Sequence, residues 1–516
     1  MKQRREAFFG LIAPIGVDLD AVTTALEQVL KTVRYAINVI RLTDLFTETP
    51  GIALEHNSEI ERYKKYIAAG DYICRKSGRN DIMALFGIAK LSKYATRNPK
   101  TPLPSDVVHV FRQIKRVEEI STLREIYGRN ILLISCYSPK ADRVDNLVKK
   151  MLKNERGTGK SKLEAQALEI IATDEDERDD PNGQRVIECY PYADYVLDCS
   201  SHETLTKSAA RLINVFFGSP FISPLVDEYC AYVANAASYR SLDLSRQVGA
   251  AIFGHNCEVI AMGCNEVPKA GGGTYWMGGA TDFRDYALGY DSNQRVREDM
   301  TRDALVRLQK GKWLSDNFKS MKPDDLVNAA FAEGGSKPGP LSRSMLKDVI
   351  EYGRMVHAEM NALTDAARFR RSTVGATLFC TTMPCHMCTK LIIAAGIDRV
   401  VYVQPYGKSL VEELFSDSVS VDEAGDPTKV RFESLKGVTP NGFKMAFHKV
   451  KRRKDSAGDA MMWDPVNADP IFVSTFPYYG ALEVKAVDAL KGAMSGLPKP
   501  RPRPKRAKKK PTPLLK

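Results

Sequence analysis

The stretch from His357 to Cys388 constrains this chain more than any other, because it sets metal-binding side chains in a fixed pattern. It reads His357-Ala358-Glu359 and then, beyond a short apolar segment, Pro384-Cys385-His386-Met387-Cys388. One histidine and two cysteines suit Zn²⁺, and a site with three protein ligands leaves the fourth position of the tetrahedron to water. The pattern therefore predicts one zinc ion per chain, held by His357, Cys385 and Cys388, with Glu359 moving protons beside it.

The spacing of these residues also predicts their local structure. Cys385 and Cys388 are three apart, so a helix running from Pro384 to about Ala395 places both sulfurs on one face of its first turn. The partial positive charge of a helix N-terminus favours the thiolate that zinc requires. His357 and Glu359 are only two apart, so both face one cavity only if they lie in the opening turn of a helix.

Two structural interpretations of the same residues stay open. A purely structural zinc site closes with four protein ligands, and Cys380 or His386 can supply the fourth. Alternatively, the two cysteines are ordinary residues of a core helix and His357 is simply buried. The catalytic interpretation is the one that also gives Glu359 a role.

The composition sets the class of protein. A chain of 516 residues predicts two or three domains. Its ten cysteines are unevenly placed and do not suggest a disulfide framework, so we expect a reducing, cytoplasmic location. No apolar run approaches the roughly 20 residues that span a bilayer. The start of the chain imitates a signal peptide, but Pro14 interrupts its apolar run, and we expect neither secretion nor a membrane partner.

The positive charge is concentrated at the end of the chain. The net charge is +12, and residues 491–516 carry ten Lys or Arg and no Asp or Glu, which leaves +2 for the rest. The tail alternates proline with basic residues and lacks an apolar pattern, so we expect a disordered arm. Such an arm can bind nucleic acid or an acidic protein, or it can remain a solvated tail.

The first two hundred residues alternate apolar strands with amphipathic helices, which predicts a parallel α/β sheet. The expected strands are Phe8 to Pro14, Ala36 to Ile40, Val107 to Phe111, Ile131 to Tyr137 and Tyr195 to Asp198. The first runs into a turn between Gly10 and Gly16 that resembles the phosphate-binding loop of P-loop kinases with one extra residue. Val17 and Asp18 stand where that loop has Lys and Ser or Thr, so Gly10 and Gly16 belong to a degenerate nucleotide site.

A boundary follows near 218–224, where glycine and two prolines interrupt the pattern. Beyond it we expect a helix over 225–244 and two strands, of which the second ends at Asn265. An Asn at a strand exit beside the metal can bond a sugar hydroxyl with its amide, or it can simply form the turn. The predicted domains are therefore 1–217, 218–490 and the tail, 491–516.

Several segments together resemble the deoxycytidylate deaminases over most of residues 225 to 410. They are 246–252, Gly263-Cys264-Asn265, 357–362, 384–388 and 395–402 with Tyr406. The complete chain is similar to bacterial anti-phage deoxycytidine nucleotide deaminases. That resemblance implies a P-loop-kinase-like parallel α/β domain, followed by a three-layer α/β/α cytidine-deaminase-like domain.

The resemblance also implies an activity. Zinc lowers the pKa of its bound water to about 7, and a deaminase of this kind converts free dCTP or dCMP to dUTP or dUMP plus ammonia, which depletes the nucleotides that an infecting phage needs. We expect Asn265, Tyr406 and the cations Arg246 and Lys269 to contact the nucleotide. We also expect a homo-oligomer and a regulatory nucleotide or small RNA that acts through the amino-terminal domain.

Two other functions stay open. The first is a deaminase that acts on cytosine or adenine within RNA or DNA, which the basic tail permits although the rest of the chain is nearly neutral. The second is a non-catalytic nucleotide sensor. The presence of Glu359 argues against the second.

Overall fold

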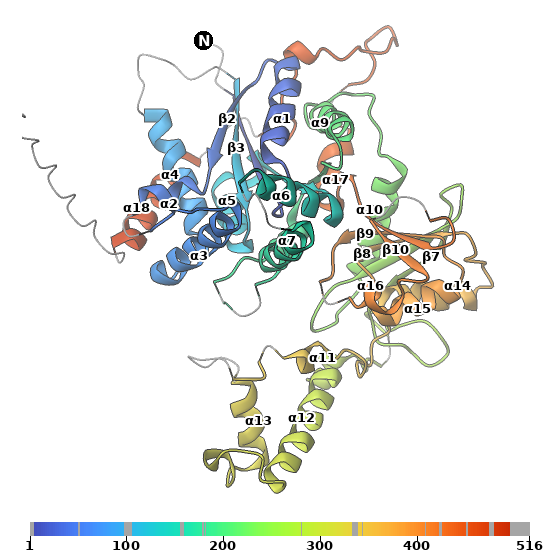
Figure 1. Ribbon diagram of the computed structural model, residues 1–516. Coiled ribbons are helices and arrows are strands. Elements are labelled where there is room, and N and C mark those ends of the chain that lie inside the picture. The colour runs from blue at the N-terminus through green and yellow to red at the C-terminus, as the bar shows by residue number, and fades with distance from the viewer. Residues whose placement is uncertain are drawn as a thin grey trace, which may run out of the picture.

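The computed structural model of this protein describes residues 5–49, 52–96, 106–154, 159–177, 180, 182–279, 281–332, 339–342, 344–407, 409–422, 426–449, 452–473 and 479–495. Within these ranges the strands form two six-stranded sheets. Figure 1 shows the sheets in separate parts of the molecule, the first with the blue and teal helices and the second with the orange ones.

The first sheet is parallel apart from one short edge strand. Its order is β12-β5-β4-β1-β3-β2, and β12 alone among the described strands of this sheet runs antiparallel, against β5. Every residue of β4 is buried, which is the pattern of a strand covered on both faces. The strands are β1 (Arg5–Ile12), β2 (Ala36–Arg41), β3 (Asp106–Ile114), β4 (Ile131–Tyr137), β5 (Tyr195–Asp198) and β12 (Gly437–Val438). The predicted parallel α/β sheet is confirmed.

Helices cover both faces of this sheet. Apolar residues of α1 and α9 form one core with Phe9 and Leu11 of β1, and those of α4, α5 and α18 (Tyr479–Ser495) form another with Phe8 and Ile12. Alternate side chains of β1 point to opposite faces of the sheet and therefore pack into two separate cores. The helices of this part are α1 (Leu19–Thr32), α2 (Asp44–Glu48), α3 (Glu59–Ser77), α4 (Ile82–Thr96), α5 (Val117–Tyr127), α6 (Lys140–Asn154), α7 (Lys160–Glu175), α8 (Val186–Cys189) and α9 (His202–Phe216), with 3-10 turns at Gly128–Asn130 and Tyr190–Tyr192.

The second sheet is mixed and lies between two helical layers. Its order is β10-β11-β9-β8-β6-β7, with β6 antiparallel to both of its neighbours and the remaining pairs parallel. Helix α10 packs on one face, and α14 and α15 pack on the other, which gives the predicted α/β/α layers. The elements are α10 (Val226–Ser238), β6 (Gly249–Phe253), β7 (Val259–Cys264), α14 (Ala358–Arg368), β8 (Thr377–Thr382), α15 (His386–Ala394), β9 (Arg399–Gln404), α16 (Val411–Leu414), β10 (Val419–Val421) and β11 (Val430–Ser434).

The first turn of helix α14 packs closely against a glycine of strand β7. A Cβ added to Gly263 of β7 would lie 2.2 Å from the carbonyl oxygen of Ala358, so only glycine permits this approach. The side chain of Asn361 then donates to the carbonyl of Cys264 at 3.0 Å. These two contacts fix the first turn of α14 against the end of β7, and they therefore position His357 and Glu359.

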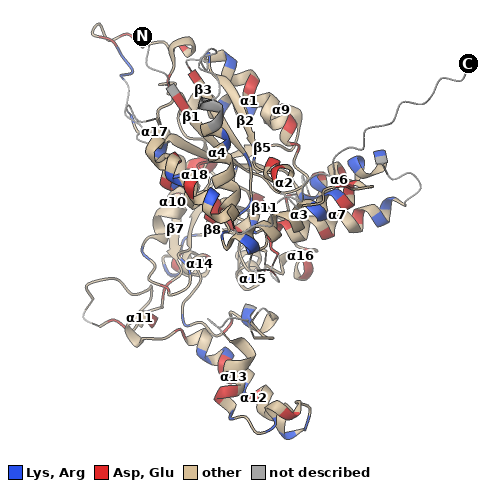
Figure 2. Cartoon of the chain, turned by 90° about the vertical axis from the view of Figure 1, so that its left-hand side faces the viewer, with Lys and Arg blue, Asp and Glu red and all other residues tan. Residues whose placement is uncertain are grey.

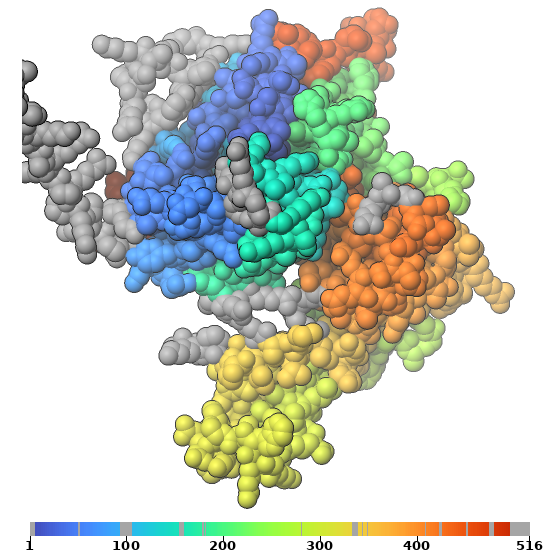
Figure 3. Space-filling model, viewed as in Figure 1, coloured from blue at the N-terminus to red at the C-terminus, as the bar shows by residue number. Residues whose placement is uncertain are grey.

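Residues 266–356 form an insertion between β7 and α14. Helices α12 and α13 pack on each other and project away from the second sheet, as the yellow lobe of Figure 3 shows. The first turn of α12 is tied to the end of the insertion, because Asn293 donates to the carbonyl of Val349 at 2.8 Å. The elements are α11 (Asp285–Leu288), α12 (Ser292–Lys310), α13 (Pro323–Phe331) and 3-10 turns at Asp316–Phe318 and Met345–Asp348.

The segment after β11 differs from the sequence prediction, which placed it with the second domain. Strand β12 joins the edge of the first sheet. Phe472 then packs into the core beneath α1 and α9, and Ala486 of α18 packs into the opposite core beside α4. The segment consists of β12, α17 (Pro440–Phe447), a 3-10 turn (Pro465–Asn467) and α18 (Tyr479–Ser495). The described parts of this segment that carry β12, Phe472 and α18 therefore pack with the first sheet.

Charges of both signs are distributed over the described surface. Figure 2 shows Lys and Arg interspersed with Asp and Glu on the helices of both parts. The predicted disordered tail, 491–516, overlaps helix α18, which continues to Ser495, so its first five residues are helical. The rest of the predicted tail lies outside the described residues. Among the helices that the structure describes, none combines the length and the apolar character needed to cross a membrane.

Candidate metal centre and active-site cavity

The predicted metal ligands lie at the starts of two helices on the same face of the second sheet. His357 is the N-cap of α14, with φ −67° and ψ 158°, and Cys385 is the N-cap of α15, with φ −75° and ψ 168°. Cys388 follows in the first turn of α15. Because both helices begin at the same edge of the sheet, their amino termini bring the three side chains together.

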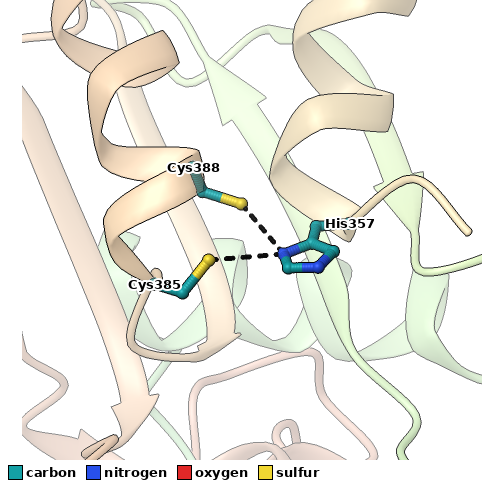
Figure 4. A group of neighbouring side chains, drawn as sticks. All are labelled: His357, Cys385 and Cys388. Carbon is teal, nitrogen blue, oxygen red and sulfur yellow. Dashed lines mark hydrogen bonds between the residues drawn. The ribbon is translucent and has the colours of Figure 1, made fainter. Parts of the chain in front are cut away.

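The three ligand atoms are close enough to share one ion. His357 Nδ1 lies 3.4 Å from Cys385 Sγ and 3.3 Å from Cys388 Sγ, and both sulfurs point toward the ring in Figure 4. All three atoms lie within 4.8 Å of one another. A tetrahedral zinc with ordinary bond lengths separates its nitrogen and sulfur ligands by about 3.5 Å. The geometry therefore fits zinc bound through Nδ1 of His357.

The two candidates for a fourth protein ligand lie elsewhere. Cys380 is buried within β8, where its thiol faces the carbonyl of Val401, and the ring of His386 faces Glu351, with 3.5 Å between Nε2 and Oε1. Neither joins the three-residue group among the described residues. The arrangement thus leaves a coordination position for a water or a substrate, as in catalytic zinc sites.

The protonation of the pair of cysteines follows from their contacts. A hydrogen bond from Cys388 and the nearby His357 lower the pKa of Cys385 to about 4. The thiolate of Cys385 and burial raise the pKa of Cys388 in turn. One sulfur is thus ready to bind a cation, and metal binding must release the proton of the other.

Glu359 lies in the first turn of α14 and is 4% exposed. Burial raises the pKa of its carboxyl group, and the nearby His357 opposes that shift. A carboxyl group with a raised pKa is better able to hold a proton near neutral pH. A residue that acts first as a base and then as an acid must be able to do this.

Glu359, His357 and Cys385 line a cavity of about 350 Å³, within the range of small-molecule sites. Its walls come from the second sheet and from the insertion. Besides these three residues they include Asp243, Ser245, Arg246, Val248, Asn265, Asp291, Asn293, Arg297, Lys347, Ile350, Met355, Ala358, Thr382, Met383 and Tyr406.

Asn265 lies in the wall of this cavity, but its amide is engaged with the backbone. Its Oδ1 accepts from the N–H of Val248 at 2.7 Å, and its Nδ2 donates to the carbonyl of Arg246 at 2.8 Å. The side chain therefore joins the start of β6 to the end of β7. This is closer to the turn-forming role that the sequence left open than to a free sugar ligand.

The structure separates the two cations that the sequence paired. The guanidinium of Arg246 lies 5.2 Å from the centre of the Tyr406 ring, and both residues line the active-site cavity. Lys269 instead lines a different pocket, together with Gly272, Gly273 and Trp276. The prediction that Lys269 contacts the same nucleotide as Glu359 does not fit this position.

The insertion supplies cavity residues that the sequence analysis missed. Asn293 and Arg297 come from the first turns of α12, and Lys347 comes from a 3-10 turn. Arg297 Nη1 donates to the carbonyl of Lys347 at 2.6 Å, which ties the two elements together. The length of the insertion was the only sign in the sequence, because long loops near a site commonly carry binding residues.

The predicted degenerate nucleotide site is closed by other parts of the chain. Gly10 lies inside β1, where an added Cβ would be 2.8 Å from side-chain carbons of Ile114 and Leu133. Gly16 has φ +97° and packs against the backbone of Arg143. Gly10 is thus a core residue of a strand, which does not fit its predicted role in a phosphate-binding turn.

Comparison with known proteins supports the second sheet as the functional part. Residues 226–404 match the family model described as the cytidine and deoxycytidylate deaminase zinc-binding region. The chain is similar to ComE operon protein 2 of Bacillus subtilis (strain 168), 39% identical over 77 residues, which are 14% of this chain and 41% of the relative. It is similar to the deoxycytidylate deaminase of Mycobacterium phage D29, 53% identical over 47 residues, 9% of this chain and 35% of the relative.

The deoxycytidylate deaminase of Enterobacteria phage T4 is 44% identical over 54 residues, 10% of this chain and 28% of the relative. The chain thus spans less than half the length of these curated relatives. A solved structure, the apo dCMP deaminase from cyanophage S-TIM5, aligns with a TM-score of 0.22 and 18% identity over 42% of this chain and 100% of that one. Residues 226–404, which hold His357, Glu359, Cys385 and Cys388, are therefore similar to the zinc-binding region of the cytidine and deoxycytidylate deaminases.

Proposed function

We propose that this protein is a zinc-dependent hydrolase that deaminates free deoxycytidine nucleotides, dCMP or dCTP, to the uracil nucleotide and ammonia. The observation that carries the proposal is the group of His357 Nδ1 and two cysteine sulfurs close to the buried carboxyl group of Glu359, in the wall of a cavity large enough for a small ligand. The matched family region and the relatives named deoxycytidylate deaminases support the choice of reaction.

The chemistry divides between the metal and the protein. Zinc held by His357, Cys385 and Cys388 supplies Lewis-acid activation of a water molecule. Glu359 accepts a proton from the attacking water as the water oxygen bonds to C4 of the cytosine ring, and it delivers this proton to N3. It then accepts the remaining proton of the new C4 hydroxyl and delivers it to the amino group, so that the C4–N bond breaks, ammonia leaves and the uracil carbonyl forms. One carboxyl group thus serves as base and then as acid, and its burial keeps competing bulk water away.

The cavity walls favour a small anionic substrate. Arg246, Arg297 and Lys347 all line the cavity, and guanidinium groups bind phosphate oxygens through paired N–H donors. Asp243 and Asp291 lie in the same wall and limit the total negative charge that the site accepts. A nucleotide with its base at Glu359 and its phosphate at the arginines satisfies both features.

The experiment that tests this proposal offers the zinc-loaded protein four substrates separately: dCMP, dCTP, deoxycytidine and a cytosine-containing single strand of DNA. Ammonia release and the uracil product are measured by chromatography. We expect turnover of at least one free nucleotide, faster than that of the nucleoside. Turnover of the strand alone would instead indicate a nucleic-acid deaminase, and nucleotide binding without any turnover would indicate a sensor.

We further propose a role in defence against phage through depletion of deoxycytidine nucleotides. The support is the resemblance of the whole chain to anti-phage deaminases, together with the proposed reaction. The test compares phage yield and the dCTP pool in cells that express the wild-type protein or Glu359→Gln. Loss of protection together with restored dCTP in the variant supports the role. Equal protection by both proteins would show that the defence does not depend on deamination.

A further inference from the structure

A second cavity, of about 320 Å³, lies between the first sheet and the second. One wall comes from the carboxyl end of β4 and from α6 and α7, and the other comes from the end of β9 and from α16. Figure 1 shows α6 and α7 of the first part on the side that faces β9 and α16 of the second. Ligands of open parallel sheets commonly bind outside the carboxyl ends of the strands. The position is therefore suited to a ligand that touches both parts.

The walls of this interdomain cavity contain buried polar atoms without protein partners. Ser138, Arg143 and Ser434 are 6%, 7% and 5% exposed. The hydroxyls of both serines, and Nε and Nη1 of Arg143, have no hydrogen-bond partner among the residues that the structure describes. The remaining nitrogen of Arg143, Nη2, donates to Glu175 at 2.6 Å. Buried donors without a partner destabilise the folded protein, so these groups favour an acceptor that the protein itself does not supply.

The chemistry of these groups indicates the ligand. A guanidinium has only donors, and two of its N–H groups with two serine hydroxyls suit the oxygens of a single phosphate group. Glu412 and Glu413 at the exposed rim and Asp422 inside the cavity disfavour a polyphosphate. The volume exceeds that of free phosphate, and Tyr137, Tyr190 and Tyr402 add aromatic wall for a flat ring.

The interdomain cavity also touches the candidate active site. Met383 and Tyr406 line both cavities, so they form a shared wall. Ser409, in the interdomain cavity, donates from its hydroxyl to the carbonyl of Pro384 at 2.9 Å, directly before the metal-binding Cys385. A ligand that moves Ser409 or Tyr406 therefore acts on residues that border the metal centre.

We propose that the interdomain cavity is a regulatory site for a nucleoside monophosphate, anchored through its phosphate by Arg143, Ser138 and Ser434. The site is separate from the candidate active site, and its occupancy changes the affinity of that site for substrate. The binding half of the proposal stands without the deaminase function, and the regulatory half rests on it.

The binding test uses calorimetric titration of the full-length zinc-loaded protein with AMP, with inorganic phosphate, and with sulfate as the control anion. We expect one AMP site per chain and weaker binding of phosphate. The double variant Ser138→Ala/Ser434→Ala should weaken AMP binding about tenfold or more, because each serine gives a hydrogen bond to a charged group. Arg143→Gln should abolish binding, and the matched variant Arg297→Gln, in the other cavity, should leave it unchanged.

Absence of AMP and phosphate binding would overturn the proposal. So would AMP binding that the serine double variant leaves unchanged, or that Arg297→Gln removes, because the ligand then lies elsewhere. The serine variants keep the test valid if Arg143→Gln fails to fold. For the regulatory half, saturating AMP should change the KM for dCMP in the wild type and not in the serine double variant. An unchanged KM would overturn the coupling.

Discussion

The carboxylate of Asp174 accepts a hydrogen bond from the backbone N–H of Ile15 at 2.6 Å, inside the turn that follows strand β1. Lys115 approaches the same carboxylate at 2.7 and 2.8 Å and donates to the carbonyl of Ala13 at 2.7 Å. In a P-loop, such backbone N–H groups cradle phosphates and a lysine of the loop reaches them. Here the carboxylate that accepts from both the backbone N–H and the lysine belongs to the buried Asp174.

We therefore predict that the protein hydrolyses ATP no faster than the uncatalysed background. A phosphate at this turn would have to displace Asp174 from both Ile15 and Lys115. The measurement is release of inorganic phosphate from ATP by the full chain, because Phe472 and Ala486 complete the two cores of the first sheet. A rate of about 1–100 per second, typical of kinases, would show that the turn opens.

Glu359→Gln is predicted to abolish deamination while leaving the fold and the metal in place. Glutamine matches the shape of glutamate but cannot accept the proton, and general acid–base help contributes about 10²–10⁴ in rate. Turnover and zinc content are measured together. The control is Glu203→Gln on α9, an exposed partner of Lys207 far from the cavity. A Glu359 variant within tenfold of the wild type would remove this residue from the mechanism.

We predict one zinc per chain and its loss in Cys385→Ser/Cys388→Ser. The two sulfurs and His357 Nδ1 form a single three-atom group among the described residues, and serine is a poor replacement for a thiolate ligand. Elemental analysis of the purified protein gives the ratio, and Cys257→Ser serves as a control thiol outside the group. Zinc retained by the double variant, or two equivalents in the wild type, would contradict the assignment.

The first sheet and the metal ligands could be predicted from the sequence because each is indicated by a pattern of neighbouring residues. Buried parallel strands such as 131–137 are continuous apolar runs, and the structure places β4 at the same residues. The two ligand motifs each lie at a helix start, where spacing alone decides which side chains share a face. Both kinds of inference need no knowledge of distant contacts.

The remaining features depend on contacts between distant segments, which local patterns do not encode. The cores that receive Phe472 and Ala486 lie more than 200 residues away from them along the chain. Lys269 follows Asn265 closely in sequence, yet the turn between them directs it to another pocket. Arg297 reaches the cavity only because the insertion folds back, and no periodicity in that segment indicates where it goes.

Arg297→Gln is predicted to weaken the use of nucleotides selectively. A charge-assisted hydrogen bond to phosphate contributes about 1.5–3 kcal/mol, so kcat/KM for dCMP should fall roughly ten- to a hundredfold. The value for deoxycytidine, which has no phosphate, should change little. The control is Arg307→Gln on the same helix, where the side chain is exposed and paired with Asp303. An equal loss for both substrates would show that Arg297 supports the cavity rather than the phosphate.

The last prediction concerns the basic tail and separates a nucleotide deaminase from a nucleic-acid deaminase. Helix α18 ends at Ser495, and its Ala493 and Met494 pack on the core beside α4, so the truncation should begin at residue 496. Nine of the tail's ten basic residues are then removed, together with most of the net charge. Binding many phosphates requires a broad positive surface, whereas one nucleotide needs only local cations such as Arg246 and Arg297. Deamination of dCMP and dCTP should therefore be nearly unchanged in the truncated protein at moderate salt. The full-length and truncated proteins are compared on both nucleotides and on a cytosine-containing single strand, with melting temperature as the control for folding. Activity confined to the strand and lost with the tail would assign the zinc site to nucleic acid instead.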